Sequence, residues 1–402
     1  FHAFSPNGSI LATVSYPDWE HSNTGTLLLT DLESWTTMTA TVPVSNVLAE
    51  PVFSPDGSRI ALLRQRIAPP SGQVLTLLEI TQMKSGSAGR ILDARLLAES
   101  DPLPLGPVMY TFTSDGSRIH LYGRDVSTLN MSYNTKALVA AVNADTLDVL
   151  WSRTLVTVLD GQYLSETEEE SADQNYWDPH ICVWWQPGRV FSHDGNKLYL
   201  VHANEARMTT VDFTTERIVA RAIEKRMGLM ERFLTWWSKP AYAKILNGVQ
   251  LEAALSHDGG QILVTGREHD YTNNVYNEAF LPLRIIDAAT GGLLATGAEG
   301  TITEPSDIDL RIFLNYYDTG SGNPMTTHRP ILASPSTGEV MQEIDEWTVI
   351  PARRLDGAAI LLGVRYVANS WGSELAILDP VTFAPTLLQA DTSNGWGLFV
   401  TQ

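Results

Sequence analysis

The sequence predicts an all-β fold, a seven-bladed β-propeller of four-stranded antiparallel blades that forms one domain over residues 1–402. Two repeated elements and the composition predict this fold. A hairpin motif recurs along the chain, and an apolar strand follows it. The chain is 44% hydrophobic and only 18% charged, which excludes a disordered protein. Seven units in 402 residues average about 57 residues each, more than the roughly 40 to 45 of typical propeller repeats, so loops must hold the excess.

The first repeated element is a hairpin built around an Asn-Gly or Asp-Gly pair. Such pairs accept the positive φ of a tight turn between two antiparallel strands. A degraded copy, LDGA, lies at 355–358, and its glycine is 98 residues after that of the fifth copy, twice the shortest spacing of 49. An eroded copy is therefore expected between them, at 306–314 (SDIDLRIFL). The five intact copies are 4–10 (FSPNGSI), 53–60 (FSPDGSRI), 112–119 (FTSDGSRI), 191–198 (FSHDGNKL) and 255–262 (LSHDGGQI).

The second repeated element is an apolar strand that ends in a turn. Its seven copies are 26–31, 75–80, 138–143, 208–212, 283–287, 330–334 and 375–379. Residues 286–296 show how the chain continues, because a Gly-containing turn reverses it into an outer strand. Four antiparallel strands repeated seven times predict a propeller, whose blades cover each other and leave no long sheet edge exposed. A last strand at 394–402 is expected to pair with the blade that contains Phe1 and to close the ring.

The repeats resemble those of bacterial propellers. Residues 51–61 (PVFSPDGSRIA) look like the Pro-Asp (PD40) repeat of TolB-type proteins, and 262–266 with 285–296 look like the YVTN repeat of surface propellers. The resemblance to these WD40-like families covers nearly the whole chain. It implies the fold and a periplasmic, cell-surface or secreted location in a bacterium. It implies no single activity, since these families include scaffolds, surface-layer proteins, subunits associated with electron transfer, and enzymes. Eukaryotic WD40 strands end in Trp-Asp, whereas the one such pair here, Trp177-Asp178, lies in a predicted loop.

A first insertion is predicted at about 160–189. It contains seven carboxylates and no Lys or Arg before Arg189, together with several aromatic residues. One interpretation is a solvated acidic loop whose aromatic residues anchor it on the blades. The other is a recognition loop for a basic protein or a cation. The candidate partner-binding residues in this insertion are Tyr176, Trp177, Asp178, Trp184 and Trp185.

A second insertion is predicted at about 221–247, and it has the only strong helix pattern of the chain. Apolar residues recur there at helical spacing, and Pro240 ends the pattern. The apolar face is expected to dock on its own domain, on a protein partner or on a membrane interface. The candidate binding residues in this segment are Phe233, Trp236 and Trp237.

The sequence contains no recognised metal, cofactor or nucleophile motif. The run Glu168–Glu170 lacks the alternating ligands and glycine of a calcium loop, and Asp178, His180 and Cys182 are an incomplete zinc set. Gly-x-Ser-x-Gly, Gly-x-Gly-x-x-Gly and phosphate-cradling Lys motifs are absent from the sequence, and the single Asp-Thr-Gly at 318–320 is expected to be a turn. No metal and no cofactor are therefore predicted. His193 and His257 replace the proline of the repeated hairpin, so they are interpreted as turn residues.

The charge and the repeats favour a binding protein. A net charge of −19 opposes binding to nucleic acid and to anionic lipid. Membrane association is expected only through the 221–247 segment or through a leader preceding Phe1. We expect a non-catalytic binding or scaffold propeller that recognises a protein partner, or a small ligand, through its insertions. The alternatives are a lactonase-like or hydrolase-like enzyme with a site in the central channel, and an accessory subunit of a redox or cell-surface assembly.

Overall fold

A computed structural model describes most of the strands and turns of the chain. The described residues are 2–15, 24–32, 34, 36–40, 44–45, 47, 49–65, 73–84, 90–103, 105–125, 136–164, 182–223, 248–272, 275–299, 301–303, 312–317, 328–334, 336–344, 347–353, 359–366 and 373–389. These residues contain strands and turns but no helix. A search of the same residues for a helix long and apolar enough to span a membrane finds none. The predicted helix at 221–247 and the predicted closing strand at 394–402 lie largely or wholly outside them.

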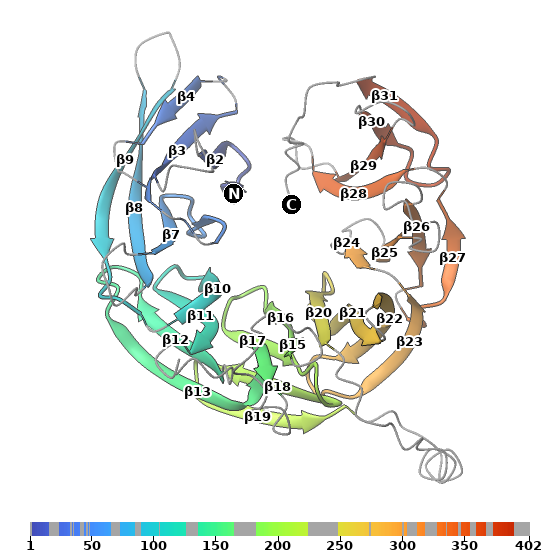
Figure 1. The fold of residues 1–402 in the computed structure, drawn as a ribbon. Helices are drawn as coiled ribbons and strands as arrows, with labels where there is room; N and C mark the ends of the chain where they lie inside the picture. Colours follow the sequence, from blue (N-terminus) through green and yellow to red (C-terminus); the bar gives the residue numbers. More distant parts are fainter. Residues whose placement is uncertain are drawn as a thin grey trace.

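The described strands combine into seven sheets that follow one another in chain order around a common centre (Figure 1). Six of them are wholly antiparallel. The first consists of β1 (His2–Phe4), β2 (Ile10–Ser15), β3 (Thr24–Asp31) and β4 (Thr36–Thr39), with β5 (Val44–Ser45) paired to β3. The second consists of β6 (Val52–Phe53), β7 (Arg59–Gln65), β8 (Gln73–Lys84) and β9 (Arg90–Glu99). The third consists of β10 (Leu105–Phe112), β11 (Arg118–Asp125), β12 (Lys136–Asn143) and β13 (Val149–Leu159).

The other three antiparallel sheets come later in the chain. The first of them consists of β16 (Gly188–Phe191), β17 (Lys197–Val201), β18 (Arg207–Asp212) and β19 (Arg217–Ala222). The next consists of β24 (Thr301–Thr303), β25 (Ile312–Tyr317), β26 (His328–Ala333) and β27 (Val340–Glu343). The last consists of β28 (Thr348–Arg353), β29 (Ala359–Tyr366), β30 (Ser373–Leu378) and β31 (Pro385–Gln389). The propeller arrangement that the repeats predict is thus observed.

One sheet is mixed and has six strands. Its members, in order across the sheet, are β14 (Gly161–Leu164), β15 (Cys182–Gln186), β20 (Gly248–Leu255), β21 (Gln261–Thr272), β22 (Val275–Asp287) and β23 (Leu293–Glu299). The part from β20 to β23 is antiparallel like the other sheets, whereas β15 pairs with β20 in parallel. The sequence does not predict this extension, because it joins strands that are distant along the chain.

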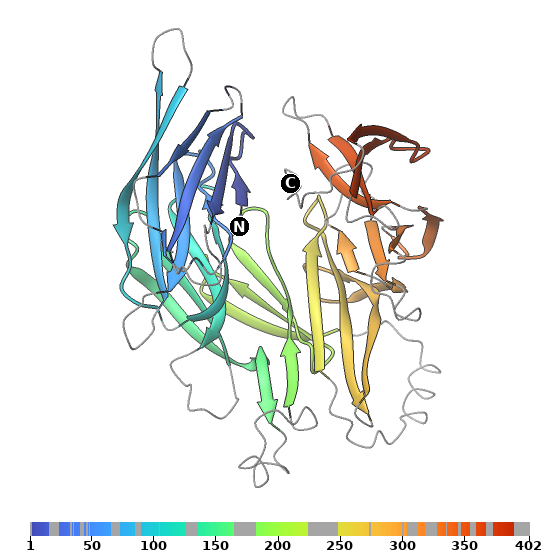
Figure 2. The same ribbon diagram turned by 45° about the horizontal axis from the view of Figure 1, so that its top comes forward.

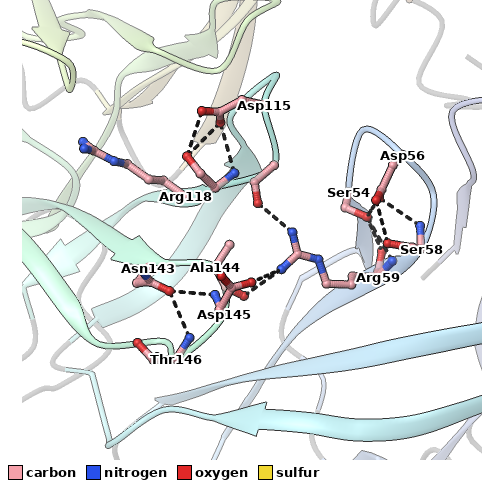
Figure 3. Close-up of polar contacts among 12 residues, drawn as sticks. Ser54, Asp56, Ser58, Arg59, Asp115, Arg118, Asn143, Ala144, Asp145 and Thr146 are labelled. Carbon is pink, nitrogen blue, oxygen red and sulfur yellow. Dashed lines mark hydrogen bonds and ion pairs between the residues drawn. The ribbon is translucent and has the colours of Figure 1, made fainter.

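The repeated hairpin turn has the same hydrogen bonds in all five intact copies. In the second copy, the Asp56 carboxylate accepts hydrogen bonds from the Ser54 hydroxyl at 2.6 Å and from the Ser58 backbone N–H at 3.0 Å (Figure 3). Gly57 adopts φ +70°, a conformation that glycine reaches without strain. Each turn joins two consecutive antiparallel strands: the first two strands of the sheet in four copies, and β20 and β21 of the six-stranded sheet in the fifth. The predicted strand–turn–strand unit is thus confirmed. The seven predicted apolar strands lie in β3, β8, β12, β18, β22, β26 and β30. Each is the third strand of its sheet, except β22, which is the third strand of the antiparallel part β20–β23.

A second turn repeats between the third and fourth strands. Asp287 accepts hydrogen bonds from the backbone and side chain of Thr290, and Gly291 follows with φ +75°. The corresponding residues of three other turns have positive φ without being glycine: Leu147 at 60°, Glu216 at 54° and Phe383 at 56°. These turns and the hairpin turns lie at one end of the sheets, here called the turn face. In each four-stranded sheet the second strand ends and the third begins at the opposite end, here called the insertion face.

Apolar side chains fill the spaces between neighbouring sheets. Leu63 and Leu75 of one sheet, for example, share a buried cluster with Ile119, Leu121 and Leu138 of the next. Each sheet thus buries its apolar faces against its two neighbours, which explains why sheets that are apolar on both faces are stable here. The core therefore runs around the ring between the sheets and holds their inner strands in place.

Candidate partner-binding site

A two-stranded ribbon, β14–β15, extends from the insertion face. Its strands pair with Gly161 opposite Trp185 and with Leu164 opposite Cys182. Figure 2 shows the ribbon as the two green arrows lowest in the view, beyond the end of the neighbouring sheets. The two ends of the first predicted insertion are thus strands, whereas the sequence pattern predicts a loop there. The reason is that residues at its two ends pair with each other, which a local pattern does not show.

The ribbon brings the two predicted insertions together. β15 runs parallel to β20, with Trp185 opposite Val249 and Gln186 opposite Gln250. Residues 165–181 lead directly into β15, and residues 224–247 lead directly into β20. Because the two strands are adjacent and point the same way, both segments reach the fold at the same edge of the insertion face.

The predicted binding residues divide into two groups. Trp184 and Trp185 lie on β15, opposite Gln162 and Gly161, and Trp185 is half-buried. The other six, Tyr176, Trp177, Asp178, Phe233, Trp236 and Trp237, lie outside the described residues, as does His180. Their place in a binding site remains a prediction.

Asp160 fixes the start of the ribbon. Its carboxylate is fully buried and lies directly before β14. It accepts hydrogen bonds from the Tyr122 hydroxyl at 2.8 Å, from Arg124 Nε at 3.2 Å and from Arg189 Nη1 at 3.3 Å. A buried carboxylate is stable only when it is paired and hydrogen-bonded, and here two guanidinium groups and a phenol do both. Asp160 is one of the seven carboxylates of the first predicted insertion, for which a solvated acidic loop is one interpretation; the structure corrects that interpretation for Asp160, which is buried.

The donors to Asp160 come from two different sheets. Tyr122 and Arg124 lie on β11, and Arg189 lies on β16 with its guanidinium carbon 5.7 Å from the centre of the Tyr122 ring. Burial, and then the Asp160 carboxylate, raise the pKa of Tyr122 well above its ordinary value of 10. The phenol therefore stays protonated and donates its hydrogen bond to Asp160. This cluster ties the ribbon to both sheets.

Gly188 allows β16 to approach β20 closely. A Cβ atom at this position would lie 3.3 Å from the Ala253 Cβ and 3.4 Å from the Leu251 Cβ. Any larger side chain would push β16 away from β20. Since β16 continues from β15 after a single residue, Pro187, this close packing also positions the ribbon.

Two of the described histidines, His193 and His120, contact backbone carbonyl groups. His193 contacts the Ser256 carbonyl of the next hairpin turn through Nε2, at 3.0 Å, which confirms its interpretation as a turn residue. His120 is buried, stacks on Phe213 at 4.1 Å and contacts the Gly195 carbonyl. Burial lowers the pKa of His120. Among the described residues, no three His, Cys, Asp or Glu side chains are grouped so that they could hold a metal ion.

No protein-family model matches the sequence, and no curated protein matches it. Solved structures do match. The dihydro-heme d1 dehydrogenase NirN, solved in complex with DHE, matches 96% of this chain over 65% of its own, with 11% identity and a TM-score of 0.49. The Dos1 propeller matches 97% of this chain over 83% of its own, with 9% identity and a TM-score of 0.49. The propeller domain of the Trilobed protease from Pyrococcus furiosus matches 96% over 94%, with 10% identity and a TM-score of 0.46.

The chain has a β-propeller fold. Identities of 9 to 11% extend to the fold alone, so the activities of these proteins are not transferred. The chain spans 65% of the NirN chain and 46% of a matched prolyl endopeptidase chain. The matched propellers include enzymes as well as propellers described without an activity.

Proposed function

We propose that this propeller is a non-catalytic binding protein that recognises a protein partner with its insertion face. The observation that carries the proposal is the parallel pairing of β15 with β20. Two segments that contain aromatic residues and are separated along the chain enter the fold side by side through this pair. Aromatic residues at one edge of a rigid scaffold are typical of protein-recognition surfaces.

The structure around the ribbon suits such a role. Both strands of the ribbon are held at its base: the buried Asp160 cluster holds β14, and the close packing at Gly188 holds β15. A binding segment attached to a rigid base loses less conformational entropy when its partner docks. The acidic residues of 165–181 favour a partner with a basic surface, since complementary charge accelerates encounter.

The number of blades, the closure of the ring, the family of the repeats and the location of the protein belong to the same proposal. The strands β20–β23 are taken as a blade, which together with the six antiparallel sheets makes seven, and residues 394–402 are taken to close the ring. The repeats are assigned to the bacterial WD40-like, YVTN and PD40 type, with a periplasmic, cell-surface or secreted location. This assignment is supported by the hairpin motif, whose hydrogen bonds recur in all five intact copies.

A pull-down with matched variants tests the proposal. The bait is the full chain, wild type or with Trp177→Ser and Trp236→Ser, and captured proteins are identified by mass spectrometry. The control is Val381→Ser, which removes a side chain that is 71% exposed on the turn face. We expect a specific partner that the double variant loses and the control keeps, with unchanged thermal unfolding of both.

Two outcomes contradict the proposal. A partner retained by the double variant and lost by the control would move the site to the turn face. The absence of any specific partner, together with hydrolysis of a lactone by the purified chain, would favour the enzyme alternative.

A further inference from the structure

A cavity of about 240 Å³ lies on the turn face, far from the ribbon along the strands. Its walls are the outer part of the β16–β19 sheet and the turn between β22 and β23, which contributes Ala288 and Ala289. We propose that this cavity binds a small organic anion with a phosphate or carboxylate group. The proposal is independent of the protein-binding function, because it concerns other residues at the opposite end of the sheets.

Three cations and one carboxylate line the cavity. Lys197, Asp212 and Arg217 are direct cross-strand neighbours on β17, β18 and β19, so their side chains lie on one face of the sheet. Arg221 is the third cation, and its guanidinium donates a hydrogen bond to the Ala289 carbonyl across the cavity. The local charge is therefore positive, on a chain whose net charge is −19.

Two of these cations have no partner in the described part of the chain. The side chains of Lys197 and Arg217 make no hydrogen bond and no ion pair there. One oxygen of Asp212 is engaged by its own turn, since it accepts the backbone N–H groups of Thr214 at 3.0 Å and Thr215 at 2.9 Å. The cations are thus available to a ligand.

A buried hydroxyl also lacks a partner. Thr210 lies opposite Tyr199 in the register of β17 and β18, and both residues line the cavity. The Thr210 hydroxyl is buried and makes no hydrogen bond within the described residues. Leaving such a group unpaired costs free energy, and rotation of the Thr210 side chain toward the cavity would bring its hydroxyl to an oxygen of a bound anion. Burial, and then Asp194 and Asp212, raise the pKa of Tyr199, so its phenol is also a neutral donor.

The place that corresponds to the cavity, between the β6–β9 sheet and the β10–β13 sheet, is occupied by the Arg59 side chain. Arg59 occupies the position of Lys197 after its hairpin turn, and it reaches the next sheet (Figure 3). It donates hydrogen bonds to the Gly116 carbonyl at 2.7 Å and the Ala144 carbonyl at 3.2 Å, and it pairs with Asp145 at 2.7 Å. The residue that corresponds to Asp145 in the β22–β23 turn is Ala289. The ion pair is therefore absent at the cavity, while the cations remain.

The chemistry of the walls defines the ligand class. Guanidinium groups bind carboxylate and phosphate through paired N–H donors. A volume of about 240 Å³ is that of roughly eight water molecules at about 30 Å³ each, which suits a small organic anion better than a single ion.

Calorimetric titration of the full chain tests the proposal with three probes: inorganic phosphate, glycerol 3-phosphate and succinate. We expect at least one probe to bind, and to bind more weakly as the salt concentration rises. Arg217→Gln is expected to weaken binding about tenfold, which equals about 1.4 kcal/mol. Arg153→Gln, an exposed arginine on the outer strand of another sheet, is expected to leave binding unchanged. The preferred probe shows whether phosphate or carboxylate is the recognised group.

A second variant fills the cavity instead of weakening it. Lys197→Arg with Ala289→Asp rebuilds the ion pair that Arg59 and Asp145 make, so it should abolish binding without lowering the thermal unfolding temperature. If no probe binds the wild type, or if Arg217→Gln and Arg153→Gln bind as tightly as the wild type, the proposal is wrong. Retained affinity in the rebuilt variant would also overturn it.

Discussion

Replacing Asp160 with asparagine removes the one charge that pairs with both Arg124 and Arg189. The Asp160 carboxylate is 0% exposed, whereas the arginine side chains are 20% and 29% exposed. Removing one member of a buried ion pair typically costs about 3 to 5 kcal/mol, because the remaining charges stay poorly solvated. Since both arginines reach some water, and since asparagine can still accept the Tyr122 hydrogen bond, we expect the lower end, about 3 kcal/mol.

Urea unfolding followed by circular dichroism measures this change. The matched control is Asp145→Asn, which also removes a carboxylate from an arginine pair, but at a side chain that is 79% exposed. Exposed pairs contribute about 0 to 1 kcal/mol, so the control should lose at most about 1 kcal/mol. Equal losses for Asp160→Asn and Asp145→Asn would refute the idea that Asp160 is a buried anchor of the ribbon.

Three further changes follow from the described geometry. Gly188→Ala should lower the free energy of unfolding by about 1 kcal/mol and Gly188→Val by about 3 kcal/mol, because the added side chain would force β16 away from β20. If thermal unfolding shows the same loss of stability for both variants, this packing is contradicted. Glu216→Gly should stabilise the chain by about 0.5 to 1 kcal/mol. Relief of the strain of positive φ contributes about 1 to 2 kcal/mol, which outweighs the greater conformational entropy that glycine gives the unfolded chain. The control Thr215→Gly should destabilise the chain. Burial lowers the pKa values of His120 and His202, with Glu205 opposing the effect at His202, so the unfolded chain binds more protons below the ordinary value of 6.5. The unfolding temperature should therefore fall from pH 7 to pH 5, and it should fall less in His120→Gln.

The parts of the fold that sequence reasoning reached are those held by neighbouring residues. The turn at Asp56 and Gly57 depends on Ser54 and Ser58, which lie within two residues of the aspartate, so the motif itself contains the structure. The turn between the third and fourth strands was seen only at 286–296, where it contains glycine. A further copy has Gly338 at the positive-φ position, but three others have Leu147, Glu216 or Phe383 there. These three residues hide the pattern.

The site was harder to predict because its contacts join distant residues. Asp160 meets donors that are 38, 36 and 29 residues away, and nothing near it in the sequence marks it as buried. The pairing of β15 with β20 spans more than 60 residues and the four strands β16–β19, which form another sheet. The cavity at Lys197 lacks the ion pair that Arg59 makes with Asp145. This difference becomes visible only when the surroundings of Lys197 and Arg59 are compared in space.

A cysteine cross-link tests most directly whether β15 and β20 lie side by side and bring the two insertions together. Gln186→Cys and Gln250→Cys are introduced with Cys182→Ser, so that only the designed pair remains among the residues of this chain. Directly paired residues on adjacent strands are about 5 Å apart, within the range that a disulfide bridges. Oxidation of the folded protein should form an intramolecular disulfide, detected as a mass loss of about 2 Da and as faster migration on a non-reducing gel after unfolding. If the two cysteines stay reduced in folded protein, β15 does not pair with β20, and the shared insertion surface does not exist.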